Sequence, residues 1–140
     1  MFKQRSATFP AELGCLSDVV RFVDDWCEKI CLEDKRGHSL RLIVDELVSN
    51  ICCHGSVSAD GTITLTLFKA DDTIVLEIQD SGVPFNPLEH EEPDLSPPLE
   101  KRSIGGLGLL LVRRLSKKMI YRREDGQNVL TVILDNRNDP

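Results

Sequence analysis

The sequence predicts an α+β fold, a two-layer sandwich in which helices pack on one face of a mixed, mostly antiparallel sheet. Two long stretches near the N-terminus repeat apolar residues at helical spacing. Two later pairs of short β-type runs are each joined by a tight turn, with a proline-rich stretch and a third helical run between them. The predicted order is strand, two helices, hairpin, irregular stretch, helix and hairpin. We assign it to a single domain, residues 1–140.

The composition is that of an ordinary globular protein. Hydrophobic residues make up 41% of the 140 residues and charged residues 29%. The formal net charge of −6 argues against a nucleic-acid-binding protein that works through its overall field. The sequence has no run of transmembrane length, no apolar signal segment and no C-x-x-C pair among its five cysteines. We therefore expect a cytoplasmic protein with reduced thiols and no direct contact with a membrane.

The first half of the chain is interpreted as an edge strand followed by two helices. Residues 3–9 alternate in part and precede Pro10, which suits a first helical turn. The helical pattern that follows ends near Glu33. A break at residues 34–37 leads into the second helix, which Gly55 ends as a C-cap.

The second half is interpreted as two hairpins on either side of a long irregular stretch and a helix. Residues 62–68 alternate threonine with apolar residues and turn at 71–72 into a second strand, 74–80. Residues 81–106 hold five of the seven prolines, and a structureless stretch of this length is usually a functional lid or a disordered insert. A helix and a closing hairpin follow, over residues 107–115, 119–123 and 129–134.

Charge is spread unevenly around the irregular stretch. Residues 101–123 hold eight Lys or Arg and no acid, whereas residues 89–100 hold five acids and no Lys or Arg. An anionic ligand or partner near the basic segment is one explanation, and a solvated helix face is the other.

The second helix carries two polar residues at the edge of its apolar stripe. Glu46 and Asn50 are four residues apart, so they stand one turn apart along the helix and about 40° apart around it. The apolar stripe centres roughly 110° from Glu46, which places the pair where it could line a cavity. The simpler alternative is that both are surface residues of an amphipathic helix, because periodicity alone is a structural signal.

Two glycine-bearing segments favour the cavity. Asp80 ends a strand two residues before Gly82; its carboxylate could accept a hydrogen bond from an exocyclic amine, and the glycine would let a flat ring approach. Alone, Asp-x-Gly is more often only a turn signal. Gly-Gly-Leu-Gly at 105–108 precedes a helix, and free N–H groups at a helix start suit a phosphate. The run is neither a Rossmann fingerprint nor a P-loop.

In this order, these segments resemble the N, G1 and G2 boxes of the GHKL (histidine kinase-like) ATPases, the Bergerat ATP-binding fold shared by gyrase, Hsp90, histidine kinases and MutL. Within that fold the chain most resembles the anti-sigma factor serine/threonine kinases of bacterial partner-switching systems. Pro84 departs from the pattern of many members, which have a second glycine there, and Ile104 stands where relatives often carry arginine. The matching segments are Glu46–Gly55, Asp80–Pro87, Gly105–Val112 and Tyr121–Thr131.

The resemblance implies a Mg²⁺- and ATP-dependent protein serine kinase. Glu46 would be the catalytic general base for an attacking serine hydroxyl. Asn50 would bind the Mg²⁺ that bridges the phosphates of ATP. Asp80 would accept a hydrogen bond from the adenine amine, and Gly82 would leave space for the adenine ring. Residues 81–106 would form the ATP lid. The other implied nucleotide-binding residues, which would contact the phosphates, are Lys101, Arg102, Gly105, Gly106, Leu107, Gly108 and Leu109.

The resemblance also implies partners. The kinase would phosphorylate a serine of an anti-sigma-factor antagonist and would sequester a sigma factor in the alternative partner state, which would regulate transcription. A homodimer is expected because relatives commonly dimerise. A histidine kinase is disfavoured, since no dimerisation helices with a phosphoacceptor histidine precede the domain. Two rivals stay open: an ATP-responsive switch that binds a partner without phosphoryl transfer, and an interaction domain with a vestigial pocket. Glu46 favours the enzyme over the switch.

Overall fold

Helices and strands account for most of the residues that the structure, a computed structural model, describes: 4–55, 61–89 and 107–137. Within these residues, the strands are β1 (Gln4–Pro10), β2 (Thr62–Lys69), β3 (Thr73–Asp80), β4 (Lys118–Glu124) and β5 (Gln127–Asp135). The α-helices are α1 (Leu16–Lys29), α2 (Asp34–His54) and α3 (Leu107–Leu115), and short 3-10 helices span Leu13–Cys15 and Pro87–Glu89.

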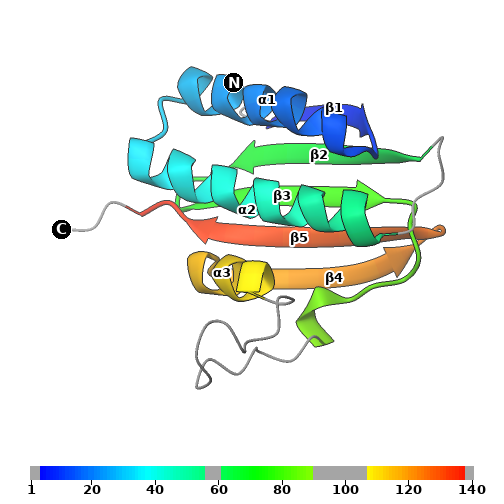
Figure 1. Ribbon diagram of the computed structural model, residues 1–140. Coiled ribbons are helices and arrows are strands. Elements are labelled where there is room, and N and C mark those ends of the chain that lie inside the picture. The colour runs from blue at the N-terminus through cyan, green and yellow to red at the C-terminus, as the bar shows by residue number, and fades with distance from the viewer. Residues whose placement is uncertain (1–3, 56–60, 90–106, 138–140) are drawn as a thin grey trace, which may run out of the picture.

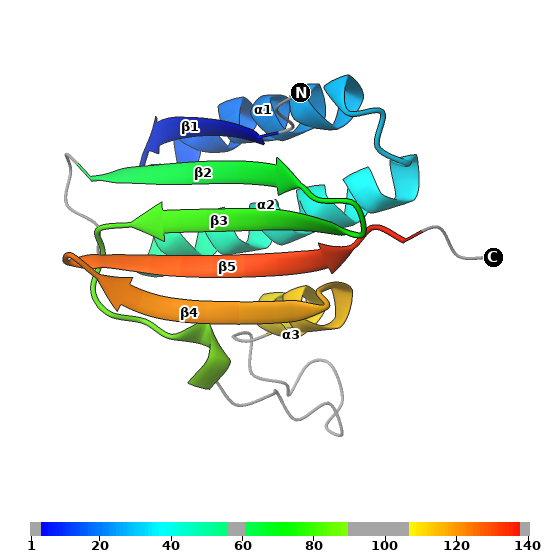
Figure 2. The same ribbon diagram turned by 180° about the vertical axis from the view of Figure 1, so that it is seen from behind.

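The described strands form one sheet in the spatial order β1-β2-β3-β5-β4, and all four pairings between them are antiparallel. The α-helices cover one face of this sheet, with α2 lying between α1 and α3 (Figure 1). The opposite face of the sheet carries no helix from the described residues (Figure 2). The predicted α+β sandwich is therefore confirmed. No helix in the described part of the chain combines the length and the apolar character needed to cross a bilayer.

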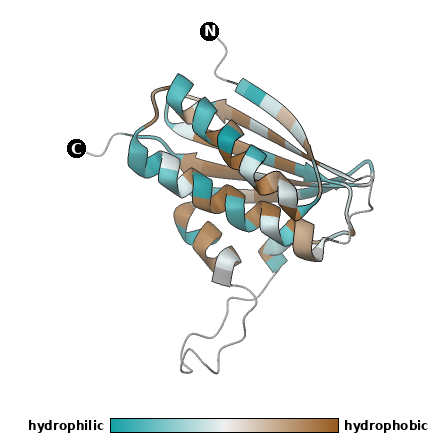
Figure 3. Ribbon diagram, turned by 45° about the horizontal axis from the view of Figure 1, so that its top comes forward, coloured by the Kyte–Doolittle hydropathy of each residue, from teal (hydrophilic) through white to brown (hydrophobic). Residues whose placement is uncertain are grey.

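The core lies between α2 and the three central strands. Every second residue of β2 and β3 is buried, and the apolar positions alternate visibly along the strands in Figure 3. The helix contributes the stripe that its sequence predicts, and each fully buried aliphatic side chain of this kind stabilises the fold by about 1.5–3 kcal/mol. The fully or almost fully buried side chains of α2 are Leu40, Ile43, Val44, Leu47 and Val48, whereas Ile51, the last residue of the predicted stripe, is only partly buried.

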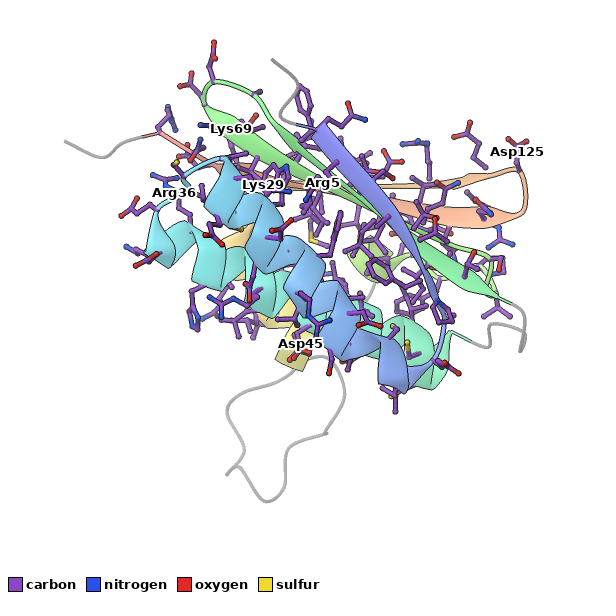
Figure 4. The ribbon with its side chains drawn as sticks, turned by 90° about the horizontal axis from the view of Figure 1, so that it is seen from above. Arg5, Lys29, Arg36, Asp45, Lys69 and Asp125 are labelled. Carbon is purple, nitrogen blue, oxygen red and sulfur yellow. The ribbon has the colours of Figure 1, made fainter. Side chains whose placement is uncertain are left out.

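Ion pairs join α1 to its neighbours at the surface. Arg5 on β1 and Lys29 on α1 both contact Asp25, and their hydrogen bonds, that of Lys29 foremost, lower the pKa of this carboxyl (Figure 4). Arg41 on α2 contacts Asp24 on α1 at 3.0 Å. Because these groups are exposed, the pairs contribute little to the stability of the fold.

The boundary between the first two helices was wrong in the sequence-based prediction. The helix α1 ends at Lys29, the chain turns through Cys31 with φ 55°, and Leu32 N–H donates to Cys27 O at 2.9 Å. Residues 34–37, predicted as the break, form the first turn of α2. Glycine disfavours a helix by only about 1 kcal/mol, so the single glycine there does not break one that packs against both α1 and the sheet.

Two smaller predictions also need correction. Pro10 ends the edge strand β1 instead of starting a helix, which is a position where the missing N–H of proline is tolerated. The stretch 81–106 is not wholly irregular, since Pro87–Glu89 form a turn of 3-10 helix. Residues 90–106, the greater part of the proposed lid, lie outside the described residues.

Candidate functional site

The helix α2 carries both Glu46 and Asn50, and each is half-buried. Neither side chain forms a hydrogen bond with another described residue, so both keep polar atoms for other partners. The neighbouring Asp45 is exposed and lies on the outer side of α2 (Figure 4). The pair thus occupies the edge of the apolar stripe, as the helical spacing predicts.

The carboxylate of Glu46 lies against the first turn of α3. A Cβ added to Gly108 would overlap Oε2 of Glu46 and would lie 2.9 Å from its Cδ. Gly108 is the second residue of α3, where backbone N–H groups lack partners within the helix and where negative charge is favoured. The fold therefore brings the predicted general base onto one of the predicted phosphate-binding glycines.

The C-terminal end of α2 meets the end of β3. Val83 N–H donates to the Gly55 carbonyl at 3.1 Å, directly after the last turn of the helix. A Cβ added to the buried Gly82 would overlap this same carbonyl oxygen and would lie 2.9 Å from Asp80 Oδ1. From the sequence, we interpreted Gly82 as leaving space for a flat ring. In the structure, the Gly55 carbonyl at the end of α2 lies so close to Gly82 that a side chain would overlap it.

Asp80 is buried at the end of β3, with 6% of its surface exposed. Its Oδ1 accepts hydrogen bonds from Gly82 N–H at 2.8 Å and from Asn128 Nδ2 at 3.2 Å. No donor from the described residues reaches Oδ2. Among the described residues, every fully buried side-chain nitrogen or oxygen has a hydrogen-bond partner. Because Oδ2 has none, it is not fully buried and is open to solvent or to a ligand. A carboxylate oxygen in this setting fits a ligand that supplies an N–H donor.

Three residues to which the sequence analysis gave no role complete the surroundings of Asp80. Tyr121 OH donates to Asn128 Oδ1 at 2.6 Å, and Arg123 Nη1 donates to the Gly82 carbonyl at 2.8 Å. Asn128 itself could have been found, because strand alternation counted back from Leu134 places it on the inward face. Tyr121 and Arg123 were assigned no role, although both lie in the matching segment Tyr121–Thr131.

These contacts make α2 the line along which the site is assembled. Glu46 contacts the start of α3, Gly55 contacts residues 82–83, and Asn50 lies between them. Gly55 lies nine positions after Glu46, or about 13.5 Å along the helix at 1.5 Å per residue. The end of α2, the end of β3 and the start of β5 lie at the same end of the sheet, measured along the strands (Figures 1 and 2).

Two more of the predicted site residues, Leu107 and Leu109, lie in the first turn of α3. Leu107 begins the helix, and the side chain of Leu109 is buried in the core with 7% exposed. Leu109 could therefore reach a phosphate only through its backbone. Four predicted residues, Lys101, Arg102, Gly105 and Gly106, lie outside the described residues.

Comparison with known proteins identifies the family. Residues 9–134 match the family model described as the histidine kinase-like ATPase domain. The chain belongs to the histidine kinase-like ATPase family. It is similar to the serine/threonine-protein kinase BtrW of Bordetella bronchiseptica, with 34% identity over 112 residues that cover 76% of this chain and 79% of that protein.

Solved structures share the fold of this ATPase. The RsbU and RsbW domains of Rv1364c from Mycobacterium tuberculosis align with a TM-score of 0.67 at 16% identity, over 96% of this chain and 33% of that one. The catalytic domain of histidine kinase ThkA aligns with a TM-score of 0.55 at 15% identity, over 94% of this chain and 96% of that one. At such identities the likeness shows the fold alone.

An ATPase domain implies a site for ATP, and the described residues of this histidine kinase-like ATPase fit one. They offer an open carboxylate oxygen on Asp80 and a glycine at the start of α3. They include no group of three or more His, Cys, Asp or Glu that could hold a metal ion. Mg²⁺ commonly binds to proteins through one or two oxygen ligands together with phosphate and water, and Asn50 is the candidate ligand here.

Proposed function

We propose that this protein is a Mg²⁺- and ATP-dependent protein serine kinase of the anti-sigma factor type. It phosphorylates a serine of an anti-sigma-factor antagonist and regulates a sigma factor by partner switching. The observation that carries the proposal is the contact between the Glu46 carboxylate and Gly108, since a module that only senses nucleotide needs no base beside the phosphate-binding turn. The name of the 34% identical relative, a serine/threonine-protein kinase, supports the same reaction.

The proposal assigns a role to each part of the site. Oδ2 of Asp80 accepts a hydrogen bond from the adenine amine. The first turn of α3 at Gly108 binds phosphate through its free N–H groups. Asn50 holds Mg²⁺, which when bound would neutralise phosphate charge. Lys101 and Arg102 of the proposed lid neutralise the γ-phosphate further. These positive charges are needed because the Glu46 carboxylate and the phosphates would otherwise repel each other.

The chemistry is transfer of the γ-phosphoryl group to serine. The serine oxygen attacks the γ-phosphorus, the bond from phosphorus to the bridging oxygen breaks, and ADP leaves with that oxygen. Glu46 accepts the hydroxyl proton as the new bond forms. Its half-buried position on α2 places the carboxylate beside the first turn of α3.

The test uses γ-labelled ATP, magnesium and candidate antagonist proteins encoded by the same genome. We expect labelled phosphoserine on one antagonist. Glu46→Gln should reduce the transfer rate by about 10²- to 10⁴-fold, the usual contribution of a general base, and should leave ATP affinity nearly unchanged. Asp45→Asn is the matched control, because it neutralises the adjacent, outward-facing carboxylate and should transfer normally.

Other outcomes identify the rival functions. ATP and antagonist binding without phosphoserine would overturn the kinase proposal in favour of an ATP-responsive switch. Antagonist binding with no effect of ATP would indicate an interaction domain. The proposed homodimer is tested separately by sedimentation, since a serine kinase of this kind could act in either assembly state.

A further inference from the structure

Asn128 is the second polar side chain that the described core buries, and it lies directly opposite the first. It is 7% exposed, and the register of β3 and β5 pairs it with Asp80. The next inward-facing pair along the same strands is Ile78 with Leu130, both buried. Asp80 and Asn128 therefore end two apolar rows, where an unpaired amide would be costly.

The Asn128 amide uses its whole hydrogen-bonding capacity. Nδ2 donates to Asp80 Oδ1 at 3.2 Å and to the Val83 carbonyl at 2.8 Å. Oδ1 accepts from Phe85 N–H at 3.2 Å and from Tyr121 OH at 2.6 Å. An asparagine amide has two N–H donors and two acceptor sites, so none is spare. These partners also fix its orientation, because a flipped amide would turn its N–H groups toward the Phe85 N–H.

Two consequences follow for the site. The amide and Gly82 N–H together hold Oδ1 of Asp80, which leaves Oδ2 as the oxygen that faces outward. The same amide binds Val83 and Phe85, so it fixes the segment that leaves β3 against β5. One side chain thus sets both the direction of the carboxylate and the course of the backbone beside it.

We propose that Asn128 is the positioning residue for adenine recognition, holding Asp80 so that Oδ2 meets the exocyclic amine of the base. The inference rests on the proposed role of Asp80 in ATP binding. Position 128 requires a hydrogen-bond donor, because a carboxylate there would repel the carboxylate of Asp80. A serine at position 128 would be too short to make all four hydrogen bonds of the amide.

The experiment compares affinities for ATP and for inosine triphosphate, which carries a carbonyl in place of the amine. Wild-type protein should prefer ATP. In Asn128→Ser the ATP affinity should fall about tenfold, while the affinity for inosine triphosphate should change little, so that the preference shrinks. Tyr121→Phe is the matched control: it removes one hydrogen bond from the same amide, on the side away from Asp80, and should keep the preference. An equal loss for both nucleotides, or an unchanged preference, would overturn the inference.

Two further measurements keep the test decisive. In wild-type protein, the side-chain amide resonances of Asn128 should shift more on addition of ATP than of inosine triphosphate, which needs no variant to fold. Equal shifts would contradict the inference. Asp80→Asn should abolish the preference for ATP. If it does and Asn128→Ser does not, the positioning role alone fails; if wild-type protein has no preference, the proposed adenine contact of Asp80 fails with it.

Discussion

At individual residues, the two glycines of the site exclude a side chain for different reasons. A Cβ on Gly108 would overlap the Glu46 carboxylate, which is the flexible end of a side chain. A Cβ on Gly82 would overlap the Gly55 carbonyl, which belongs to the backbone at the end of α2. A carboxylate can rotate aside, whereas a packed helix end cannot move without disturbing its contacts. Replacement by alanine should therefore affect activity at one glycine and stability at the other.

Gly108→Ala is expected to displace the Glu46 carboxylate and leave the fold intact. Alanine is favoured over glycine within a helix by up to about 1 kcal/mol, so the free energy of unfolding should stay level or rise. The rate of serine transfer should fall by about 10²-fold, because the base loses its position. Urea unfolding and initial rates measure the two effects. Gly14→Ala is the control, since a Cβ there meets no atom within 4 Å; a normal rate in Gly108→Ala would refute the assigned contact.

The cysteines should differ in reactivity according to burial. Cys31 and Cys53 are exposed, whereas burial raises the pKa of Cys27 to about 11 and that of Cys52 to about 12. Since the thiolate is the reactive form, iodoacetamide at pH 8 should label the two exposed cysteines first. Labelling of Cys27 and Cys52 should require unfolding or strongly alkaline pH. Mass spectrometry of timed samples checks this order, and early modification of Cys52 would contradict the described packing of α2.

Among the secondary-structure elements, α2 determines the geometry of the site. Its apolar stripe packs on the sheet, its edge presents Glu46 and Asn50, and its C-terminal end fixes the segment after β3 through Gly55. The backbone hydrogen bond from Val83 to Gly55 joins residues 28 positions apart in the sequence. Displacement of this helix end would therefore disturb the surroundings of Asp80 before those of Gly108.

Gly82→Ala tests the junction between α2 and β3. The added Cβ meets backbone at Gly55, so the substitution should reduce the free energy of unfolding by about 1–3 kcal/mol, as overpacking does. ATP affinity should fall as well, because Asp80 Oδ1 lies within 2.9 Å of the same Cβ position. Urea unfolding and calorimetry measure the two losses, again against Gly14→Ala. Stability equal to that of the wild type would show that Gly55 does not approach Gly82 this closely.

Across the fold, the sequence predicts what depends on local periodicity. The alternation at 62–68 and 74–80 and the apolar stripe of α2 each follow from which residues one layer must bury, so these elements are predictable. The break between α1 and α2 was misplaced because glycine and charge weigh less than packing there. The helix starts at 107 as predicted, and the turn at Asp125 and Gly126, with φ 51° and 75°, lies between the two predicted strands of the closing hairpin.

The site was less predictable because its partners are distant in the sequence. The Asp80–Asn128 hydrogen bond spans 48 positions, and it exists because β5, not β4, pairs with β3. The charged residues of β4 suit an edge strand, but the register in which β5 pairs with the distant β3 has no local signal, so the sequence could not assign Asn128 a partner. The contact of Glu46 with Gly108 likewise depends on how α3 packs beside α2. The roles given to these residues in ATP binding stay predictions.

The most direct test of the account is calorimetric titration of the folded protein with ATP in the presence of magnesium. We predict saturable binding at one site per chain, weakened when magnesium is removed by a chelator, because Asn50 would act through the metal. Asp80→Asn should bind more weakly than wild type, since its side chain would present a donor to the adenine amine. Absence of heat and of any ATP-dependent rise in melting temperature, in protein shown to be folded, would contradict the account.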